Sequence, residues 1–292
     1  MKIAVIFGTW SVGARPLNFN NLWTDPRGLT GSDLGVVVIS KELAARGHDV
    51  HLFTAHVDAV NKPKEWENVK LYNFEERNII DNSFNAIISI NEPDVFRGIN
   101  SKALKVCWQF LNDFSYSQPG YDDFVDVWLS PCEMHMEYLK KLVPKPEKWS
   151  VLPLGCTPEW YEDKRISGRV IWTSSCDRGL HWLLNQWPTI KEAVPYATLK
   201  IFYHFNYDSV INFEHNSGYH PHIVEMAQRM RYIREMAKKL KPLGVEHVGS
   251  ISRADMEQEA SKASVFAFSV DTVSFSEGFS VSTLEAHASF TV

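Results

Sequence analysis

The sequence predicts an α/β protein of two consecutive domains, each built on a parallel sheet. Short apolar runs alternate with helical segments, the order that produces parallel strands joined by crossover helices. This alternation stops in a polar, turn-rich segment at 153–168 and then starts again. The length of 292 residues suits two domains of about 150 residues each. We therefore expect one domain at 1–160 and a second at 161–292.

Six apolar runs in the first domain are rich in Val, Ile, Leu and aromatic residues, as strands buried on both faces are. They begin at Lys2, His48, Val69, Ala86, Lys105 and Val125. A helix is predicted over 32–47, because Val36, Ile39 and Leu43 recur at helical spacing and Gly47 ends the pattern.

The second domain repeats the alternation. Its strands are predicted to begin at Arg169, Thr198, His247 and Ser264. A helix with Leu180, Leu184 and Trp187 on one face should kink or end at Pro188. A longer helix at 222–244 carries basic residues that we interpret as its solvated face. These are Arg229, Arg231, Arg234, Lys238, Lys239 and Lys241. A further helix is expected after Ser252, because Asp255 three positions later resembles a capping box.

The composition excludes several classes of protein. With 45% hydrophobic and 22% charged residues, the chain can form a packed core and is not a disordered protein. A formal net charge of −5 provides no broad positive field, so we expect no nucleic-acid partner. The four cysteines match no zinc or redox spacing and are typical of a reducing compartment. No signal peptide or integral membrane segment is evident, so a cytoplasmic protein is expected.

An unusually long connection follows the first strand. That strand ends at Gly8 and the next helix begins near Ser32, whereas loops beyond about 12–15 residues in a compact domain are usually functional. The connection contains Trp10 and closes on Gly31 and Ser32, where Ser32 as N-cap would leave helix amides facing an anion. The alternative is a capped helix behind a mobile loop.

Arg178 follows the first strand of the second domain and is predicted in the first turn of a helix. A cation there opposes the helix dipole. It makes sense if the guanidinium and the backbone amides share an anion. The alternative is a solvated arginine at a frayed helix end.

Two glutamates near the end of the chain form the third candidate. Glu277 and Glu285 are eight positions apart, just over two helical turns, and so lie on nearly the same face. A carboxylate accepts bidentate hydrogen bonds from a diol such as ribose. The alternative is a capping Glu277 and an unrelated surface Glu285.

Three segments together resemble the retaining, GT-B-fold glycosyltransferases of glycosyltransferase family 4. They are LGVVVISKELAARGHDVHLFT, SCDRGLHWLLNQWPTIKEAVPYATLKIF and SEGFSVSTLEAHAS. The E-x7-E element in the last of them is the most specific. The resemblance implies two Rossmann-like domains and a UDP- or GDP-linked sugar as donor, bound mainly by the second domain. It implies a hexosyltransferase type of activity that needs no metal and no other cofactor.

The same resemblance implies roles for individual residues. Gly31 and Ser32 would approach the donor phosphate and the acceptor. Arg178, followed by Gly179, stands where the family has a lysine before glycine, and would hold the diphosphate. Its guanidinium, together with helix N-termini, would replace a divalent ion in stabilising the leaving group.

The E-x7-E element would contact the donor sugar and the nucleoside. Glu277 would lie near the donor sugar, with Gly278 and Phe279 offering backbone contacts. Glu285 would bind the ribose hydroxyls. Glu277 and Arg178 are thus the residues expected to take part in catalysis.

Three departures from the family pattern shape further expectations. Thr173 and Ser174 occupy the region of a second basic residue, so phosphate binding would rest on Arg178 and backbone amides. No residue matches the histidine that the family commonly has near the acceptor. Candidates for the acceptor side are instead Trp10, Asn91, Glu92, Asn112 and Asp113. The acceptor itself, a carbohydrate, lipid or protein, is not specified by the sequence.

The third departure is the short continuation after Glu285. Family members continue through further strands and helices, so we expect a second domain that is incomplete at its C-terminus. An incomplete sheet has an unpaired edge, which favours a homo-oligomer or poor solubility. Two alternative functions remain at this point: a nucleotide-sugar epimerase of the same fold, and a non-catalytic nucleotide-sugar-binding fragment.

Overall fold

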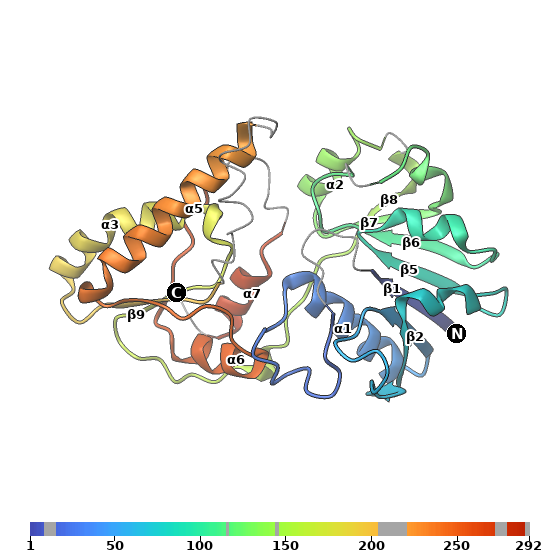
Figure 1. Ribbon diagram of the computed structural model, residues 1–292, viewed down its shortest axis with the longest axis horizontal. Helices are drawn as coiled ribbons and strands as arrows, with labels where there is room; N and C mark the ends of the chain where they lie inside the picture. Colours follow the sequence, from blue (N-terminus) through green and yellow to red (C-terminus); the bar gives the residue numbers. More distant parts are fainter. Residues whose placement is uncertain (9–15, 115–116, 144–145, 204–220, 272–278, 290–292) are drawn as a thin grey trace. The chain divides into compact units, whose positions relative to one another are not determined.

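The computed structural model describes residues 1–8, 16–114, 117–143, 146–203, 221–271 and 279–289 (Figure 1). The chain forms two compact units. Unit 1 comprises Met1–Leu22 and Leu29–Leu154, and unit 2 comprises Trp23–Gly28 and Gly155–Val292. Part of the long N-terminal connection thus belongs to unit 2, and the chain passes between the units six residues earlier than the expected position after 160.

Unit 1 is built on an eight-stranded sheet in the order β3-β4-β2-β1-β5-β6-β7-β8. Its strands are β1 (Lys2–Phe7), β2 (Asp49–Thr54), β3 (Glu65–Trp66), β4 (Val69–Asn73), β5 (Ala86–Ile90), β6 (Leu104–Trp108), β7 (Val127–Ser130) and β8 (Trp149–Val151). All neighbours pair in parallel except the β3–β4 hairpin. The strand order reverses beside β1, between β2 and β5, which is where open α/β sheets bind ligands. All six strands predicted for this domain are confirmed.

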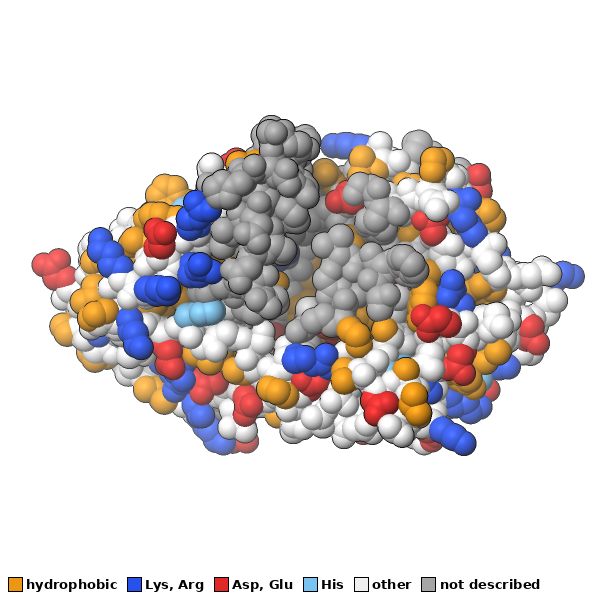
Figure 2. All heavy atoms as spheres, viewed as in Figure 1, with side chains coloured by type: hydrophobic (Ala, Val, Ile, Leu, Met, Phe, Trp, Pro, Cys, Tyr) orange, Lys and Arg blue, Asp and Glu red, His pale blue; other side chains and the backbone are white. Residues whose placement is uncertain are grey.

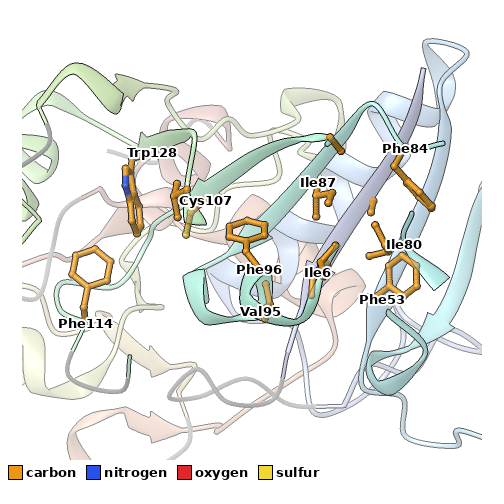
Figure 3. Close-up of a cluster of buried hydrophobic side chains, with 14 of the residues drawn as sticks. Ile6, Phe53, Ile80, Phe84, Ile87, Val95, Phe96, Cys107, Phe114 and Trp128 are labelled. Atoms are coloured by element: carbon orange, nitrogen blue, oxygen red, sulfur yellow. The ribbon is translucent and has the colours of Figure 1, made fainter. Parts of the chain in front are cut away.

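The core of unit 1 explains why these runs form strands. Ile6, Phe53 and Ile87 are fully buried on adjacent parallel strands, where β-branched and aromatic side chains pack well. Figure 3 shows this cluster, with Phe114 and Trp128 at one end. Burial of each such side chain contributes about 1.5–3 kcal/mol.

The helices of unit 1 are α1 (Gly31–Ala45) and α2 (Glu133–Leu139), with 3-10 turns η1 (Phe74–Ile79), η2 (Pro93–Gly98), η3 (Tyr121–Phe124) and η4 (Pro146–Lys148). The expectation that Ser32 caps α1 is wrong. Thr30 is the N-cap: its Oγ1 accepts from the Asp33 amide, and the Asp33 carboxylate accepts from the Thr30 amide. This reciprocal capping box places Ser32 within the helix.

Unit 2 is built on a parallel sheet in the order β11-β10-β9-β12. The strands are β9 (Arg169–Trp172), β10 (Thr198–Ile201), β11 (Val245–His247) and β12 (Val265–Phe266). β9 lies between β10 and β12, so the strand order again reverses beside the first strand of the unit. The third strand begins two residues before His247, because Val245, rather than the predicted run, pairs with Leu199.

Helices cover both faces of this sheet. They are α3 (Leu180–Ala193), α5 (Pro221–Lys239), α6 (Arg253–Lys262) and α7 (Val281–Ala288), with 3-10 turns η5 (Pro158–Trp160), η6 (Cys176–Arg178) and η7 (Lys241–Leu243). α3 and α5 lie side by side and pack with Trp172 on one face (Figure 1). Ile171 packs on the other face with Ala260 of α6 and Ala288 of α7, as the alternation of side chains along a strand requires.

Two expectations about these helices have different outcomes. The Ser252 cap of α6 is confirmed, since its Oγ accepts from the Asp255 amide at 3.1 Å. α3 does not end at Pro188 but continues to Ala193. The hydrogen bond that Pro188 cannot donate is outweighed by the burial of Leu184 and Trp187, both fully buried in the core of the unit. In the part of the chain that the structure describes, no helix has the length and apolar character to cross a membrane.

Candidate functional site

The topology of unit 2 brings the predicted Arg178 segment and the residues that follow β12 to one edge of its sheet. β9 and β12 are neighbouring parallel strands, with Val170 opposite Val265 and Ile171 opposite Phe266. Their carboxyl ends therefore lie at the same edge. The chain continues from β9 into η6, which contains Arg178, and from β12 into residues 267–271. Glu285 lies farther along the chain in α7, which packs on the opposite face of the sheet from α3.

The two segments are fixed against each other at Gly179. This residue has φ +108°, and a Cβ there would lie 1.6 Å from the carbonyl oxygen of Ser269. The Ser269 hydroxyl donates to the Gly179 carbonyl at 2.9 Å, and the Asp271 amide donates to the Arg178 carbonyl at 3.3 Å. Only glycine fits both this backbone conformation and this close approach.

The sequence predicted Arg178 in the first turn of α3. The structure instead places it just before the start of that helix. It is the last residue of η6, and Gly179 separates it from Leu180, where α3 begins. The left-handed conformation of Gly179 interrupts the helical backbone between η6 and α3. α3 begins without a side-chain cap and has no acidic residue in its first turn. Backbone amides at such a helix start point outward and favour an anion.

A carboxylate already lies at this helix start. One oxygen of Asp271 (Oδ2) accepts from the Trp182 indole at 2.8 Å and lies 3.1 Å from His181 Nε2. The Arg229 guanidinium is 3.5 Å from the same oxygen. The Trp182 hydrogen bond lowers the pKa of Asp271, and the charges of Arg229 and His181 lower it further. The start of α3 is thus an environment that stabilises negative charge.

The placement of Arg229 corrects the interpretation of the basic run on α5 as uniformly solvated. Its side chain is only 15% exposed. Its Nη1 donates to the carbonyl oxygens of Asp271 at 2.7 Å and Asp177 at 3.3 Å. Arg229 therefore ties α5 to both segments of the site. Together with burial, its charge lowers the pKa of His181.

Glu285 lies in α7 and forms a buried ion pair. Its Oε1 is 2.6 Å from Arg253 Nη1, and the exposed fractions of the two side chains are 15% and 7%. Arg253 also donates from Nε to Glu257 at 3.0 Å and from Nη2 to the Tyr161 hydroxyl at 2.7 Å. Glu285 is therefore not a surface residue, whereas its relation to Glu277, which lies outside the described residues, stays a prediction.

Burial and charge act in opposite directions in this cluster. Burial by itself would lower the pKa of Arg253, but the charge of Glu285, with Tyr161 and Glu257, outweighs it and raises that pKa. Burial raises the pKa of the Tyr161 hydroxyl, and the negative charge of Glu285 raises it further. At neutral pH Arg253 is therefore charged and Tyr161 neutral.

The segment Trp23–Gly28 packs beside the same cluster. The Trp23 carbonyl accepts from the Ala254 amide at 3.0 Å, at the start of α6. The Trp23 ring contacts Trp160 edge-on at 5.5 Å, and the Arg253 guanidinium lies 5.2 Å from the Trp160 ring. Gly28 is required here, because its φ is +70° and a Cβ would lie 2.5 Å from the Ile251 carbonyl.

In unit 1 the four described acceptor-side candidates follow β5 and β6. Asn91 and Glu92 are 1% and 4% exposed, whereas Asn112 is half-buried and Asp113 is exposed. The Asn91 side chain accepts from the amides of the residues after β6, Phe110 at 2.6 Å and Leu111 at 3.2 Å. Asn91 thus shapes the end of β6. Any contact of these four residues with an acceptor stays a prediction.

Glu92 is packed against the end of β1, because a Cβ on Gly8 would lie 2.2 Å from its carboxylate. At the start of α1, Gly31 is exposed with open space around it and Ser32 is half-buried. Phe279 is half-buried just before α7. Trp10, Glu277 and Gly278 lie outside the described residues.

Five further residues of unit 2 belong to the candidate site but were not singled out from the sequence for it. They are Tyr161, His181, Arg229, Arg253 and Asp271. Arg229 had a signal that could have identified it, since it lies between Met226 and Ile233 on the apolar face of α5. The others are joined by contacts between elements far apart in the sequence.

Comparisons with known proteins support the fold. No protein-family model matches the sequence, and no curated protein matches it. Among solved structures, Alr3699/HepE from Anabaena in complex with UDP and glucose superposes with a TM-score of 0.62 at 13% identity, over 100% of this chain and 79% of that chain. A glycosyltransferase from Rickettsia africae ESF-5 gives 0.63 at 10% identity, over 100% and 78%.

The lipopolysaccharide outer core galactosyltransferase WaaB, in its apo form, gives a TM-score of 0.55 at 11% identity, over 100% and 79% of the two chains. At these identities the likeness concerns the fold. The two parallel-sheet units, each with the strand order reversed beside its first strand, have the fold of the GT-B glycosyltransferases.

Proposed function

We propose that this protein transfers a sugar from a UDP-linked donor to an acceptor hydroxyl. The observation that supports the proposal is the pairing of β9 with β12, because the η6 segment with Arg178 and the described residues after β12 follow these two strands at one sheet edge. Solved structures of the similar protein HepE contain UDP and UDP-glucose. This supports a nucleotide-sugar as donor and uridine as its base.

The diphosphate would bind at the start of α3. Arg178 supplies a cation there, and the uncapped first turn supplies backbone amides. The Trp182 indole and the His181 ring, which now contact the Asp271 carboxylate, would then be available to hydrogen-bond a phosphate in its place. Such preorganised donors stabilise a leaving diphosphate without a metal. We therefore expect the activity to persist in excess EDTA.

The ribose would bind at Glu285. The ion pair with Arg253 fixes the position of the carboxylate, and each carboxylate oxygen can accept more than one hydrogen bond. Two hydroxyls of a ribose could therefore bind beside the guanidinium. Glu277, with Gly278 and Phe279, is proposed to contact the donor sugar. On this proposal the ribose and the diphosphate are held by segments that follow neighbouring strands.

We also propose retention of configuration, which rests on the family resemblance. The acceptor hydroxyl would form a bond to the anomeric carbon on the face from which the nucleotide leaves. The bond from that carbon to the phosphate oxygen breaks, and the hydroxyl proton passes to the leaving phosphate. The anomeric configuration of the product, read by NMR, tests this step independently of donor binding.

A thermal-shift screen with UDP, GDP and ADP tests donor binding. A ligand at about 100 times its Kd adds about 2.7 kcal/mol to the unfolding free energy, which raises Tm by several degrees. We expect UDP to raise Tm more than GDP or ADP. Equal or absent shifts would contradict a UDP site.

Turnover separates the proposed transferase from its alternatives. With UDP-glucose and a panel of glycan acceptors, the proposal predicts UDP release that depends on an acceptor. Conversion of UDP-glucose to its epimer without an acceptor would instead identify an epimerase. Binding of UDP-glucose without any turnover would identify a binding protein.

A further inference from the structure

Unit 2 has a groove of about 910 Å³ at the opposite edge of its sheet from the proposed donor site. It is lined by the first residues of three strands, Arg169 of β9, Thr198 of β10 and Val245 of β11. The proposed donor site lies instead at the carboxyl ends of β9 and β12. The groove is therefore a separate place in the fold, and its volume falls in the range of ligand pockets.

The charge of this groove is opposite to that of the chain. Five of its lining residues are basic, although the whole chain has a net charge of −5. They are Arg169, Lys200, Arg234, Lys238 and Lys241. Two carboxylates face them: Glu246 lines the groove, and Glu259 pairs with both Arg169 and Lys200. Among the described residues that line the groove, Lys and Arg outnumber Asp and Glu by five to one.

The spacing of the cations on α5 concentrates this charge. Arg234 and Lys238 are four positions apart and so share one helix face, and Lys241 follows three positions later in η7. Like charges at this spacing on one helix face repel each other. Lys239, the next residue after Lys238, does not line the groove although it is also exposed.

The chemistry of these side chains indicates the ligand. Arginine binds phosphate through two parallel hydrogen bonds, and lysine binds it as a point charge. Arg169 is only 12% exposed, whereas Lys238 and Lys241 are exposed. Cations at different depths suit a ligand with more than one anionic group. We propose that the groove binds a phosphate-bearing multivalent anion.

Calorimetry with inorganic tripolyphosphate tests the proposal on the full chain. Titrations are carried out with saturating UDP present, so that a probe bound at the donor site would be displaced. We expect binding that Lys238→Glu weakens about tenfold or more, since hydrogen bonds to charged groups contribute about 1.5–3 kcal/mol. Lys239→Glu, with the same change of charge one residue away, should retain the wild-type Kd. Glu246→Lys should tighten binding.

A second measurement distinguishes a soluble anion from a lipid headgroup. Cosedimentation with phosphatidylcholine vesicles containing phosphatidylglycerol uses the same variants. Vesicle binding that Lys238→Glu removes and Lys239→Glu retains would support the groove with a lipid as the source of phosphate. Tripolyphosphate binding without vesicle binding would support a soluble ligand.

Three results would overturn the proposal. They are no binding of either probe, equal weakening by Lys238→Glu and Lys239→Glu, and loss of tripolyphosphate binding when UDP is added. Each variant is first checked for an unchanged Tm, so that misfolding is not mistaken for loss of binding. Because the comparison between the two lysines does not depend on UDP binding, a failure of the proposed transferase function would leave this test intact.

Discussion

The Glu285 carboxylate and the Arg253 guanidinium form an ion pair of 2.6 Å, with both side chains largely buried in unit 2. The pair joins α7 to the start of α6 on one face of the sheet. Tyr161 and Glu257 hold the guanidinium from two further directions. The proposed ribose ligand is thus part of a network that also stabilises the fold, so its variants need readouts that separate these two roles.

Replacement of Arg253 by methionine should destabilise the protein strongly. It leaves the Glu285 charge buried without its guanidinium, which typically costs about 3–5 kcal/mol of unfolding free energy. The double variant Arg253→Met/Glu285→Met should recover part of that loss, because it removes both charges. Urea unfolding measures both. Arg165→Ala, which breaks the exposed pair with Asp163 at 2.8 Å, is the control and should cost less than about 1 kcal/mol. An equal loss of unfolding free energy in Arg253→Met and in the control Arg165→Ala would contradict the structural role of Arg253.

Replacement of Glu285 by glutamine should abolish discrimination between UDP and 2′-deoxy-UDP. The wild-type protein should bind UDP about tenfold more tightly than 2′-deoxy-UDP, because the charged carboxylate accepts a hydrogen bond from the 2′-hydroxyl. In Glu285→Gln the ratio of the two Kd values, measured by calorimetry, should approach one. Glu257→Gln is the matched control, since Glu257 also pairs with Arg253 but is not proposed to contact the ribose. A ratio that Glu285→Gln leaves at the wild-type value would exclude Glu285 as the ribose ligand.

Replacement of Gly179 by alanine should disrupt the contact between the segments that follow β9 and β12. The added Cβ would lie 1.6 Å from the Ser269 carbonyl, and φ +108° is strained for any other residue. We expect Gly179→Ala to lower Tm by several degrees and to reduce UDP affinity together. Gly155→Ala, where no atom lies within 4 Å of the new Cβ, should change neither. An unchanged Tm in Gly179→Ala would show that the two segments do not approach as described.

The unfolding free energy should decrease as the pH falls from 7 to 5. Burial lowers the pKa values of His51, His56, His135 and His181 in the folded protein. The unfolded chain therefore binds more protons in this range, and stability rises with pH. His135→Gln should reduce the slope, because its ring is fully buried between Ser130 and the Leu111 carbonyl. The unfolding free energy is measured by urea unfolding at each pH. The series is repeated in about 0.5 M salt to screen surface charges. A flat profile would contradict these shifts.

Long buried strands were predictable from the sequence, whereas the two short edge strands of unit 1 were not. β1 and β5 lie in the interior of the sheet and have near-continuous apolar runs. β3 and β8 have only two and three residues, too few to show a period, and were missed. At the start of α1 both Thr30 and Ser32 are capping residue types. Only Thr30 is followed by an acid three positions later, which was a usable signal.

Residues of the candidate site were predictable where the neighbouring sequence determines their position. They were not predictable where tertiary contacts determine it. Arg178 and Gly179 could be located from the strand before them. The partner of Glu285 could not, because Arg253 is 32 positions away on another helix. The continuation of α3 past Pro188 was also not predictable locally, because burial of Trp187 outweighs one lost hydrogen bond. The packing of Trp23–Gly28 with unit 2 likewise depends on contacts with residues more than a hundred positions away.

The most direct test of a diphosphate site at the start of α3 is calorimetric titration of UDP into the wild-type protein and Arg178→Ala. The variant removes the cation and leaves the backbone amides in place, so we expect UDP affinity to fall about tenfold or more. Arg165→Ala, an exposed arginine elsewhere in unit 2, should bind UDP as the wild type does. Equal UDP affinity in wild type and Arg178→Ala, with Tm unchanged, would contradict the account.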